Sequence, residues 1–402
     1  MNILQFCYKP PYPAVDGGTI GMYSVAQGFV NAGHKVKVLT FCSDKNPFQK
    51  DMLPQNYIET YKPEAVWVDL KTNVFDALLY VMIARSYVVE RFVTSKMKNK
   101  LMSVLQKDDY DIVQIESINL VPYIPLIRQI SKAAVTFHCP NVEHLIWKRM
   151  YMNQKNNIFK RWYLKNTYQN MKYFETAHIN DFDLVLPATD VDAQYLKREM
   201  KCVKPCKGVP IGFEVAEDLP EVAVEENSLF HIGSMNWFPN QQGIKWFLNE
   251  VWQEVLKASP DVKLYLAGRQ MGSYFTQGSW KNVNAVGEVA DSTLFMCSKQ
   301  IMVVPLLSGS GIRIKILEAM SLSKAVIATT IAAEGIMYTD KVNILIADTP
   351  QEFAQAVKKL TQDKEYCTQI GNNAAELIKE KYNINTVANQ ILDEYGKLLN
   401  KQ

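Results

Sequence analysis

The stretch IMVVPLLSGSGIRIKILEAM, residues 301–320, decides how this chain folds. Its apolar first part, residues 301–307, predicts a buried strand that ends at a glycine-rich turn. From Ile312 onwards the pattern predicts a helix whose first turns carry the cations Arg313 and Lys315. Glycine lets a backbone approach a ligand closely, and the free N–H groups at a helix start attract anions. The stretch therefore predicts an α/β unit with a place for an anion.

The charged residues of this helix favour one kind of anion. Arg313 can bind two phosphate oxygens at once, and Lys315 adds a second positive charge. Lys315 and Glu318 are three residues apart, so the predicted helix carries them on one face. This layout suits a diphosphate joined to a sugar. A capped surface helix with a Lys–Glu pair explains the same residues without a ligand.

Length and composition favour a globular protein of two domains. A chain of 402 residues is too long for one ordinary core, and 48% hydrophobic with 21% charged residues is typical of globular proteins. A net charge of +3 gives no reason to expect nucleic acid as a partner. Since there is no secretory signal, no apolar run of membrane-spanning length and no zinc-type spacing among the seven cysteines, we expect a cytoplasmic protein without a metal site.

Short apolar runs alternate with longer helical patterns along the whole chain, which indicates parallel sheets with crossover helices. The expected strands are 2–8, 35–41, 66–70, 111–116, 133–138 and 183–187, then 229–233, 262–267, 283–286, 301–305, 325–328 and 343–346. We therefore expect an α/β protein of two doubly wound, Rossmann-like domains that face each other across a cleft. The domains are expected at 1–207 and 208–385, with a last helix at about 386–402 that packs back on the first.

Several phrases of the chain resemble one known family. They are Gly17-Gly18, Ala32-Gly33-His34-Lys35-Val36, Thr136-Phe137-His138, Leu317-Glu318-Ala319-Met320 and Ser323-Lys324-Ala325-Val326-Ile327-Ala328. Together with the two-domain rhythm, they resemble the retaining nucleotide-sugar glycosyltransferases of family 4, which have the GT-B fold. The resemblance covers nearly the whole chain, and it is most similar to a sub-branch that reads Gly-x-Gly-x-Arg-x-Lys-x-Leu-Glu-Ala-Met.

The resemblance implies donor contacts along this segment. Glu318 matches the family glutamate that binds the ribose of the donor nucleotide, whereas the family's other glutamate falls on Ser310. Contacts to the donor sugar are therefore expected from the Ser310 hydroxyl and from the backbone of Ser310, Gly311 and Ile312. Glu334 is expected to bind a sugar hydroxyl.

A second departure from the family concerns the loop 233–243. The family usually has an arginine and a lysine there for the donor phosphates, but this loop contains no cation. A diphosphate in a partly dry site needs a positive partner. We therefore expect Arg313 and Lys315 to take over that role, while Gly233 keeps its backbone contact and Asn240 donates a neutral hydrogen bond.

Residues of the first half are expected to complete the site. His138 ends the fifth expected strand, where the family places a histidine that faces the donor sugar. The family lets Gly17 and Gly18 approach the donor phosphates and the acceptor, although a tight turn explains them equally well. Because no G-x-G-x-x-G pattern occurs there, no dinucleotide cofactor is expected. Asn141 and Glu143 are acceptor candidates; Glu143 is either a base towards the acceptor or a helix cap.

Residues 147–174 contain seven cations, interleaved aromatic residues and no acidic residue. Such a segment is consistent with binding to an anionic membrane surface near a lipid-linked acceptor. It is also consistent with a solvated helix whose aromatic side chains lie in the core, or with nucleic-acid phosphates, which the overall charge disfavours.

The resemblance implies a metal-independent retaining glycosyltransferase of the hexosyltransferase type. It would move a sugar from a nucleotide-diphosphate donor to a glycan or lipid-linked saccharide, in bacterial surface polysaccharide synthesis. Two alternatives stay open. One is a sugar-nucleotide epimerase of the same fold, and the other is a non-catalytic protein that binds a nucleotide or a glycan.

Overall fold

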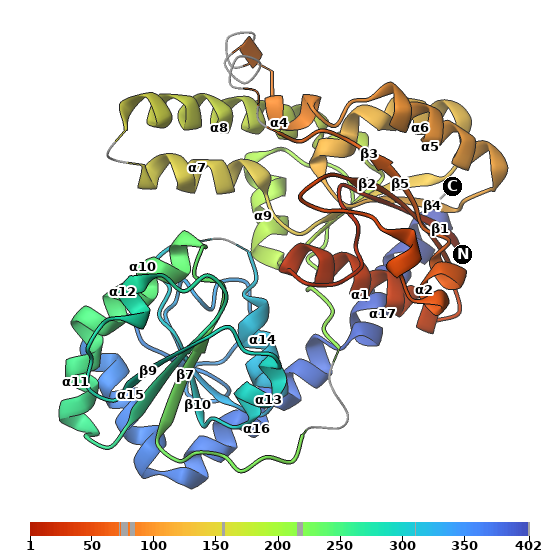
Figure 1. Cartoon of the computed structure of the whole chain (residues 1–402). Coiled ribbons are helices and arrows are strands. Elements are labelled where there is room, and N and C mark those ends of the chain that lie inside the picture. The colour runs from red at the N-terminus through yellow and green to blue at the C-terminus, as the bar shows by residue number, and fades with distance from the viewer. Residues whose placement is uncertain are drawn as a thin grey trace. The chain divides into compact units, whose positions relative to one another are not determined.

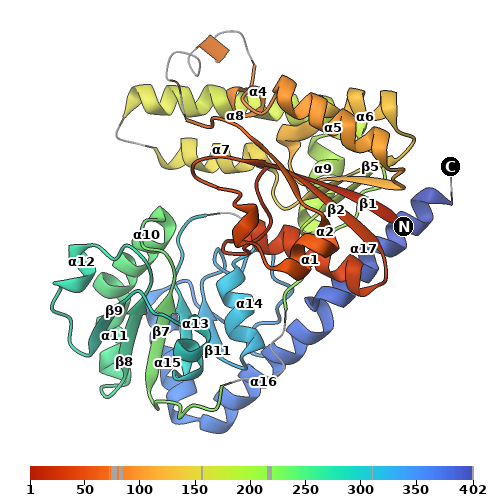
Figure 2. The same cartoon turned by 45° about the vertical axis from the view of Figure 1, so that its right-hand side comes forward.

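A computed structural model describes residues 1–71, 73, 79–80, 85–154, 157–214, 220–309 and 311–400. The chain divides into two compact α/β units (Figures 1 and 2). The first consists of Met1–Gly212 and Ile384–Gln402, and the second is Phe213–Asn383. Ser310, which is expected to contact a donor sugar, lies outside the described residues.

The first unit is built on a six-stranded parallel sheet in the order β3-β2-β1-β4-β5-β6. Its strands are β1 Asn2–Cys7, β2 Lys35–Cys42, β3 Glu64–Trp67, β4 Ile112–Ile115, β5 Ala134–Cys139 and β6 Leu184–Pro187. Its helices are α1 Gly17–Asn31, α2 Gln55–Tyr61, α4 Tyr87–Glu90, α5 Ser95–Lys107, α6 Ile124–Ile130, α7 Glu143–Asn153, α8 Ile158–His178, α9 Asp190–Glu199 and α17 Ile384–Leu399, with short 3-10 helices at Lys50–Met52, Ile118–Tyr123 and Ile179–Asp181.

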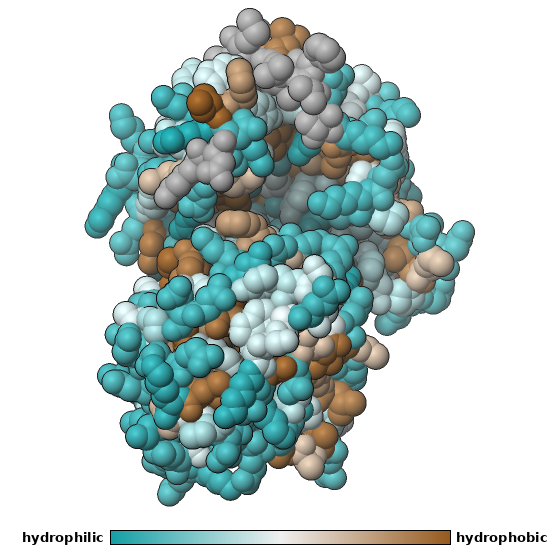
Figure 3. Space-filling model, turned by 60° about the vertical axis from the view of Figure 1, so that its left-hand side comes forward, coloured by the Kyte–Doolittle hydropathy of each residue, from teal (hydrophilic) through white to brown (hydrophobic). Residues whose placement is uncertain are grey.

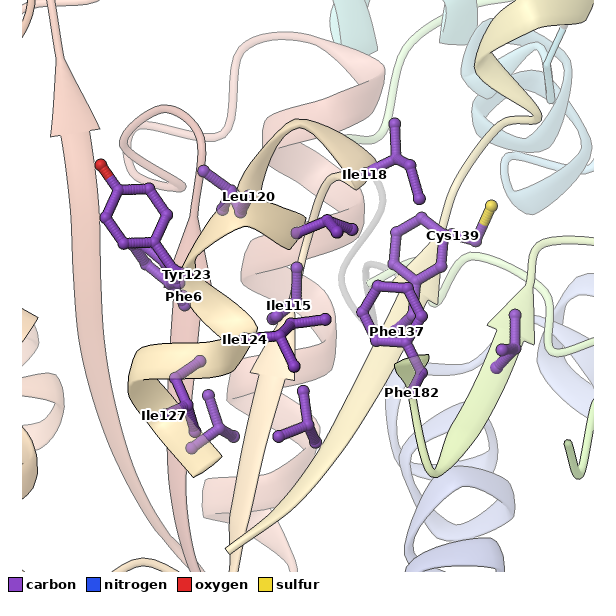
Figure 4. Close-up of a cluster of buried hydrophobic side chains, with 14 of the residues drawn as sticks. Phe6, Ile115, Ile118, Leu120, Tyr123, Ile124, Ile127, Phe137, Cys139 and Phe182 are labelled. Carbon is purple, nitrogen blue, oxygen red and sulfur yellow. The ribbon is translucent and has the colours of Figure 1, made fainter. Parts of the chain in front are cut away.

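Side chains of this sheet alternate between two buried clusters, one on each face, as the period of a strand requires. On β1, Leu4 and Phe6 join the cluster under α5 and α6, and Figure 4 shows that cluster around Phe6 and Phe137. Ile3 and Cys7 join the other cluster, together with residues of α1 and α17. The last helix of the chain therefore packs in the first unit, where the hydroxyl of Tyr395 lies 3.1 Å from that of Thr136.

The second unit has a parallel sheet in the order β12-β11-β10-β7-β8-β9. Its strands are β7 Ser228–Ile232, β8 Lys263–Ala267, β9 Val283–Gly287, β10 Ile301–Val304, β11 Ala325–Ala328 and β12 Leu345–Ile346. Its helices are α10 Phe238–Trp246, α11 Trp252–Ala258, α12 Ser273–Thr276, α13 Ser292–Cys297, α14 Ile314–Ser321, α15 Pro350–Gln362 and α16 Lys364–Lys381, with a π-helical turn at Phe247–Val251. The buried ring of Phe247 meets that of Phe353 edge-on, with centroids 5.4 Å apart.

The structure confirms the predicted fold class, since each expected strand overlaps an observed one. The largest displacement concerns the edge strand β3, which the sequence places at 66–70 and the structure at Glu64–Trp67. A charged residue such as Glu64 does not predict a strand. At the sheet edge its carboxylate forms ion pairs with Lys37 and Lys100, and these pairs stabilise Glu64 within β3.

Candidate functional site

In the second unit, the strand order reverses between the neighbours β7 and β10. Open parallel sheets usually bind their ligands at the carboxyl ends of the strands at such a reversal. The loop after β7 begins at Gly233 and leads into α10, and the loop after β10 leads through the glycine-rich turn into α14. The two loops that the sequence singles out therefore start on adjacent strands.

The amine of Lys315 connects these two loops. Its Nζ donates a hydrogen bond to Oδ1 of Asn240 at 2.8 Å and lies 3.2 Å from Nε2 of His231. Asn240 is buried in α10, and its own Nδ2 donates to the carbonyl of Ser234 at 2.8 Å. A residue of α14 is thus held by the end of β7 and the start of α10.

His231 is fully buried in β7, and its hydrogen bonds determine its protonation state. Its Nδ1 lies 2.8 Å from the carbonyl oxygen of Val303 on β10. Because a carbonyl only accepts, Nδ1 carries the proton, and Nε2 presents a lone pair to Lys315. Burial and the charge of Lys315 lower the pKa of His231 well below its usual value, so the ring is neutral.

The same surroundings make the charge of Lys315 sensitive to pH. Burial, and secondly the positive charge of Arg313, lower the pKa of the Lys315 amine to about 7, and Glu318 opposes this shift. An anion bound beside the amine would favour its charged form. The site therefore holds a cation that a negatively charged ligand would stabilise.

Gly233 makes room for this amine. A Cβ atom built on Gly233 would lie 2.7 Å from Nζ of Lys315 and 2.8 Å from Nδ2 of Asn240. Any side chain at this position would displace one of them. The glycine that the sequence assigns to the donor loop thus allows Lys315 to reach the end of β7.

Arg313 lies just before α14, and its guanidinium is buried against the glycine-rich turn. It donates to the carbonyl of Gly311, and its Nη2 lies 3.4 Å from the carbonyl oxygen of Ile331. Gly311 has a φ of 78°, in the left-handed region that favours glycine. The guanidinium also lies 6.0 Å from the ring of Trp237, so it connects the turn to the loop after β7.

The other expected donor residues surround this place. Glu318 follows Lys315 on α14, and burial raises the pKa of its carboxyl, while the charge of Lys315 opposes the shift. Ile312 is half-buried between the turn and the helix. Glu334 is exposed on the segment that follows β11.

The first unit contains a pocket of about 780 Å³ at the carboxyl ends of its strands. Residues that follow β1 to β5 line it, among them Tyr8, Lys9, Asn119, Asn141 and Glu143. The two acceptor candidates of the sequence therefore lie in one pocket. Its mixed lining of cations, carboxylates and amides can bind a polar molecule with many hydroxyl groups.

Glu143 is the first residue of α7, but it does not cap that helix. The backbone N–H groups of Glu143 and His144 donate to the two carboxylate oxygens of Glu175 on α8, at 3.0 and 2.8 Å. The helix-cap alternative for Glu143 is therefore wrong, because another carboxylate takes that place. Burial, and secondly the charge of Glu175, raise the pKa of Glu143 to about 7.

His138 is buried at the end of β5. Its Nδ1 lies 2.7 Å from a carboxylate oxygen of Glu116, and the other oxygen of Glu116 accepts from Gln5 at 2.6 Å. Since the carboxylate accepts from Nδ1–H, the remaining nitrogen Nε2 is left with no hydrogen-bond partner among the described residues. His138 does not belong to the lining of the pocket.

Gly17 and Gly18 open α1, whose N-terminus is capped by the side chain of Asp16. A Cβ atom on Gly18 would lie 2.8 Å from the hydroxyl of Tyr8, so a larger residue there would displace the end of that side chain. The pair opens the helix that follows β1, and Gly18 lies beside the side chains of the pocket residues Tyr8 and Lys9.

Two features are absent from the described residues. In that part of the chain, no three His, Cys, Asp or Glu side chains gather closely enough to hold a metal ion. None of the described helices combines the length and the apolar character that crossing a membrane requires.

Residues 226–363 match the family model described as glycosyl transferases group 1. The matched stretch contains β7, the glycine-rich turn and α14, and with them His231, Lys315 and Glu318. The second unit carries a group 1 glycosyl transferase domain.

Other known proteins are similar to this chain over nearly its whole length, but at low sequence identity. An uncharacterized 44.6 kDa protein in the cps region of Klebsiella pneumoniae is 22% identical over 400 residues, which cover 96% of this chain and 97% of that protein. Sucrose-phosphate synthase from Thermosynechococcus elongatus has a TM-score of 0.73 at 14% identity and covers both chains completely. Anabaena HepE in complex with UDP has a TM-score of 0.68 at 13% identity, over 99% of this chain and 100% of its own. The chain has the GT-B fold.

The sequence missed two residues of this arrangement. In the glycosyl transferase domain, His231 orients Lys315, and in the first unit Glu116 orients His138. Both lie at or near the ends of apolar runs that form buried strands. A buried polar side chain must find a partner, so a histidine inside such a run was the signal available for His231.

Proposed function

We propose that this protein is a retaining glycosyltransferase of the hexosyltransferase type. It moves a sugar from a nucleotide-diphosphate sugar to a hydroxyl group of a glycan or lipid-linked saccharide, without needing a metal ion. One observation carries the proposal. Lys315 and Arg313, which follow β10, both reach the cation-free loop after β7 in a glycosyl transferase domain.

The charges suit a diphosphate. The segment 233–243, which is the loop after β7 and the first turns of α10, contains no lysine or arginine, yet the amine of Lys315 lies against Gly233 at its start. Two cations beside the N-terminus of α14 would bind the phosphates and stabilise the charge that develops on the leaving diphosphate. Glu318 would bind the ribose, and the backbone of Gly311 and Ile312 the sugar.

The comparisons support a nucleotide-sugar donor and suggest the process. HepE is crystallised with UDP and with UDP-glucose, and the relative from Klebsiella pneumoniae lies in a cps region. UDP is therefore the first nucleotide to test. Surface polysaccharide synthesis is the process that we propose.

The proposed reaction breaks the bond between the anomeric carbon and the diphosphate oxygen, and the electron pair leaves with the diphosphate. The acceptor oxygen forms its bond to the same face of the carbon. Its proton passes to the leaving phosphate oxygen. Such a reaction retains the configuration and needs no carboxylate at position 310.

The first unit would bind the acceptor. We assign the acceptor to the pocket that Asn141 and Glu143 line, because it can hold a saccharide. Nε2 of His138, which is buried and has no hydrogen-bond partner among the described residues, would accept a hydrogen bond from a sugar hydroxyl. Gly17 and Gly18 would admit phosphate or acceptor, and Glu334 would bind a sugar hydroxyl in the second unit.

Calorimetric titration with UDP tests the donor site. We expect Lys315→Met to weaken UDP binding at least about tenfold, the usual effect of losing a charged hydrogen bond, and Arg313→Ala to abolish it. Because Arg313 also holds the glycine-rich turn, Lys315→Met is the cleaner variant. Lys257→Met is the matched control, since Lys257 is exposed and paired with Glu254 on α11. Unchanged affinity in Lys315→Met would refute the assignment.

Activity assays separate the alternatives. A transferase is expected to hydrolyse UDP-sugar slowly without an acceptor and to yield a product whose anomeric configuration, read by NMR, equals that of the donor. An inverted product contradicts the proposal. An epimerised donor would indicate the epimerase, and binding without any turnover a non-catalytic protein. A chelator is expected to leave the rate unchanged.

A further inference from the structure

The helices α7 and α8 of the first unit lie side by side, and the chain passes from the last residue of α7, Asn153, to the first residue of α8, Ile158, at one end of the pair (Figures 1 and 2). Large apolar side chains near their joined ends are exposed. These are Met150, Met152, Ile158, Phe159 and Trp162, here called the hairpin tip. Ile158 and Phe159 are 82% and 87% exposed, which is far outside the usual range for such residues. An exposed apolar cluster of this kind marks an interaction surface.

The aromatic side chains of this segment are divided. Trp147 and Phe174 pack partly buried against the core of the first unit, whereas Phe159, Trp162 and Tyr173 are exposed. The prediction of a solvated helix with its aromatic residues in the core is wrong for these three. In Figure 3 the left-hand side of Figure 1 is turned towards the viewer. Hydrophobic side chains are exposed among hydrophilic ones on the face that this view shows.

The charged side chains around the hairpin tip are all positive. Residues 147–174 contain seven lysine or arginine residues and no aspartate or glutamate. Lys148, Lys160, Arg161 and Lys165 are exposed among the apolar side chains. An apolar tip flanked by cations is the pattern with which interfacial helices bind anionic lipids.

We propose that the hairpin tip inserts into the headgroup region of an anionic bilayer. A second copy of the chain fits less well, because a symmetric contact would bring the cations of both copies together without an acidic partner. Nucleic acid fits less well too, since the aliphatic side chains of Met152 and Ile158 have nothing to gain from stacked bases or phosphates.

The proposal has a consequence that rests on the proposed function. Trp147 lines the acceptor pocket, and Met150 of the hairpin tip follows it on the same helix α7. Three residues of helix span only about 4.5 Å. Insertion of the tip would therefore hold the pocket near the headgroups, where a lipid-linked saccharide presents its sugar.

Co-sedimentation of the full chain with vesicles tests the proposal. Vesicles of phosphatidylcholine with one quarter phosphatidylglycerol are compared with pure phosphatidylcholine, each at 50 mM and 500 mM salt. We expect binding to the anionic vesicles at low salt and a loss of at least about tenfold at high salt or without the anionic lipid.

Two double variants examine the two parts of the surface. Ile158→Ser with Phe159→Ser and Lys160→Gln with Arg161→Gln are each expected to weaken vesicle binding at least about tenfold. The apolar control is Val191→Ser with Val203→Ser, at positions 76% and 82% exposed elsewhere on the first unit. The charge control is Lys197→Gln with Arg198→Gln on α9. Both controls are expected to bind as the wild type does.

Three results would overturn the proposal. They are no binding of the wild type to anionic vesicles at low salt, equal binding of hairpin variants and controls, and a dimer in sedimentation velocity that the hairpin variants dissolve. Titration of the hairpin variants with UDP keeps this test separate from the proposed function. We expect their UDP affinity to equal that of the wild type, because none of these residues lies in the donor site.

Discussion

The imidazole of His231 stands between the carbonyl of Val303, 2.8 Å from Nδ1, and the amine of Lys315, 3.2 Å from Nε2. Because Nδ1–H donates to this carbonyl, Nε2 is left as a hydrogen-bond acceptor for the amine of Lys315. The ring is neutral, so it holds the amine without adding a second positive charge beside it. His231 thereby acts as a positioning residue for the cation that we assign to the diphosphate.

Replacing His231 is expected to weaken nucleotide binding through Lys315. His231→Leu removes the acceptor and leaves Asn240 as the remaining described anchor of the amine. We expect UDP affinity, measured by calorimetry, to fall about tenfold, or ~1.4 kcal/mol. His231→Gln offers an amide oxygen to Lys315 and should recover most of the affinity. Equal affinities for both variants and the wild type would show that the ring has only a packing role.

Gly233→Ala is expected to disturb the same amine from the other side. Its new Cβ would lie 2.7 Å from Nζ of Lys315, the movable end of a long side chain. The domain should therefore fold, but UDP affinity should fall about tenfold or more because the cation is displaced. Gly272→Ala, with nothing within 4 Å of its Cβ, is the matched control. If the two variants bind UDP equally, the close approach at Gly233 has no role in binding.

UDP binding is expected to take up protons near neutral pH. The amine of Lys315 has a pKa of about 7 in the free protein, and a bound diphosphate would raise it. At pH 8 the free amine is about nine-tenths neutral, so binding should take up close to one proton, and affinity should fall about fivefold from pH 7 to 8. Titrations in buffers of different ionisation enthalpy measure this uptake. In Lys315→Arg, whose charge is permanent, only the ionisation of UDP itself should remain.

Glu143→Gln is expected to change the pH dependence of stability. The pKa of the Glu143 carboxyl is about 7 in the folded protein and about 4.5 in the unfolded chain. The folded protein therefore holds this proton more tightly, and the resulting stabilisation is complete below pH 4.5 and is lost as the pH rises through 7. Glutamine stays neutral, so the variant should unfold at a higher temperature than the wild type at pH 8 and lose this advantage at pH 4.5. A melting difference that is the same at both pH values would contradict the assignment.

The strands could be predicted because parallel strands between two helical layers are apolar on both faces. Ile301–Val304 is such a run, and each of its residues is buried. An apolar run of this length predicts a buried strand without any knowledge of the residues that it contacts in the folded protein. The edge strand β3 was misplaced because Glu64 acquires its partners, Lys37 and Lys100, only in the folded sheet.

The candidate site was predictable only where its residues lie close together in the chain. Arg313, Lys315 and Glu318 share one short stretch, and their charges indicate an anion directly. His231 lies 84 residues before Lys315, and no local pattern joins them. The role of Glu143 was open for the same reason, since the carboxylate that caps α7 comes from Glu175, 32 residues later.

The sequence by itself determined the α/β class, the positions of the strands other than the edge strand β3, and the charged helix start within 301–320. Burial on a parallel sheet and charge at a helix start are local properties of the chain. The tertiary structure alone decided that the amine of Lys315 meets His231 and Asn240. That meeting depends on β7 and β10 being neighbours in the sheet, although more than sixty residues separate them in the chain. It also decided which aromatic side chains of 147–174 are exposed, because only packing against α7 and the sheet determines which face of α8 is covered.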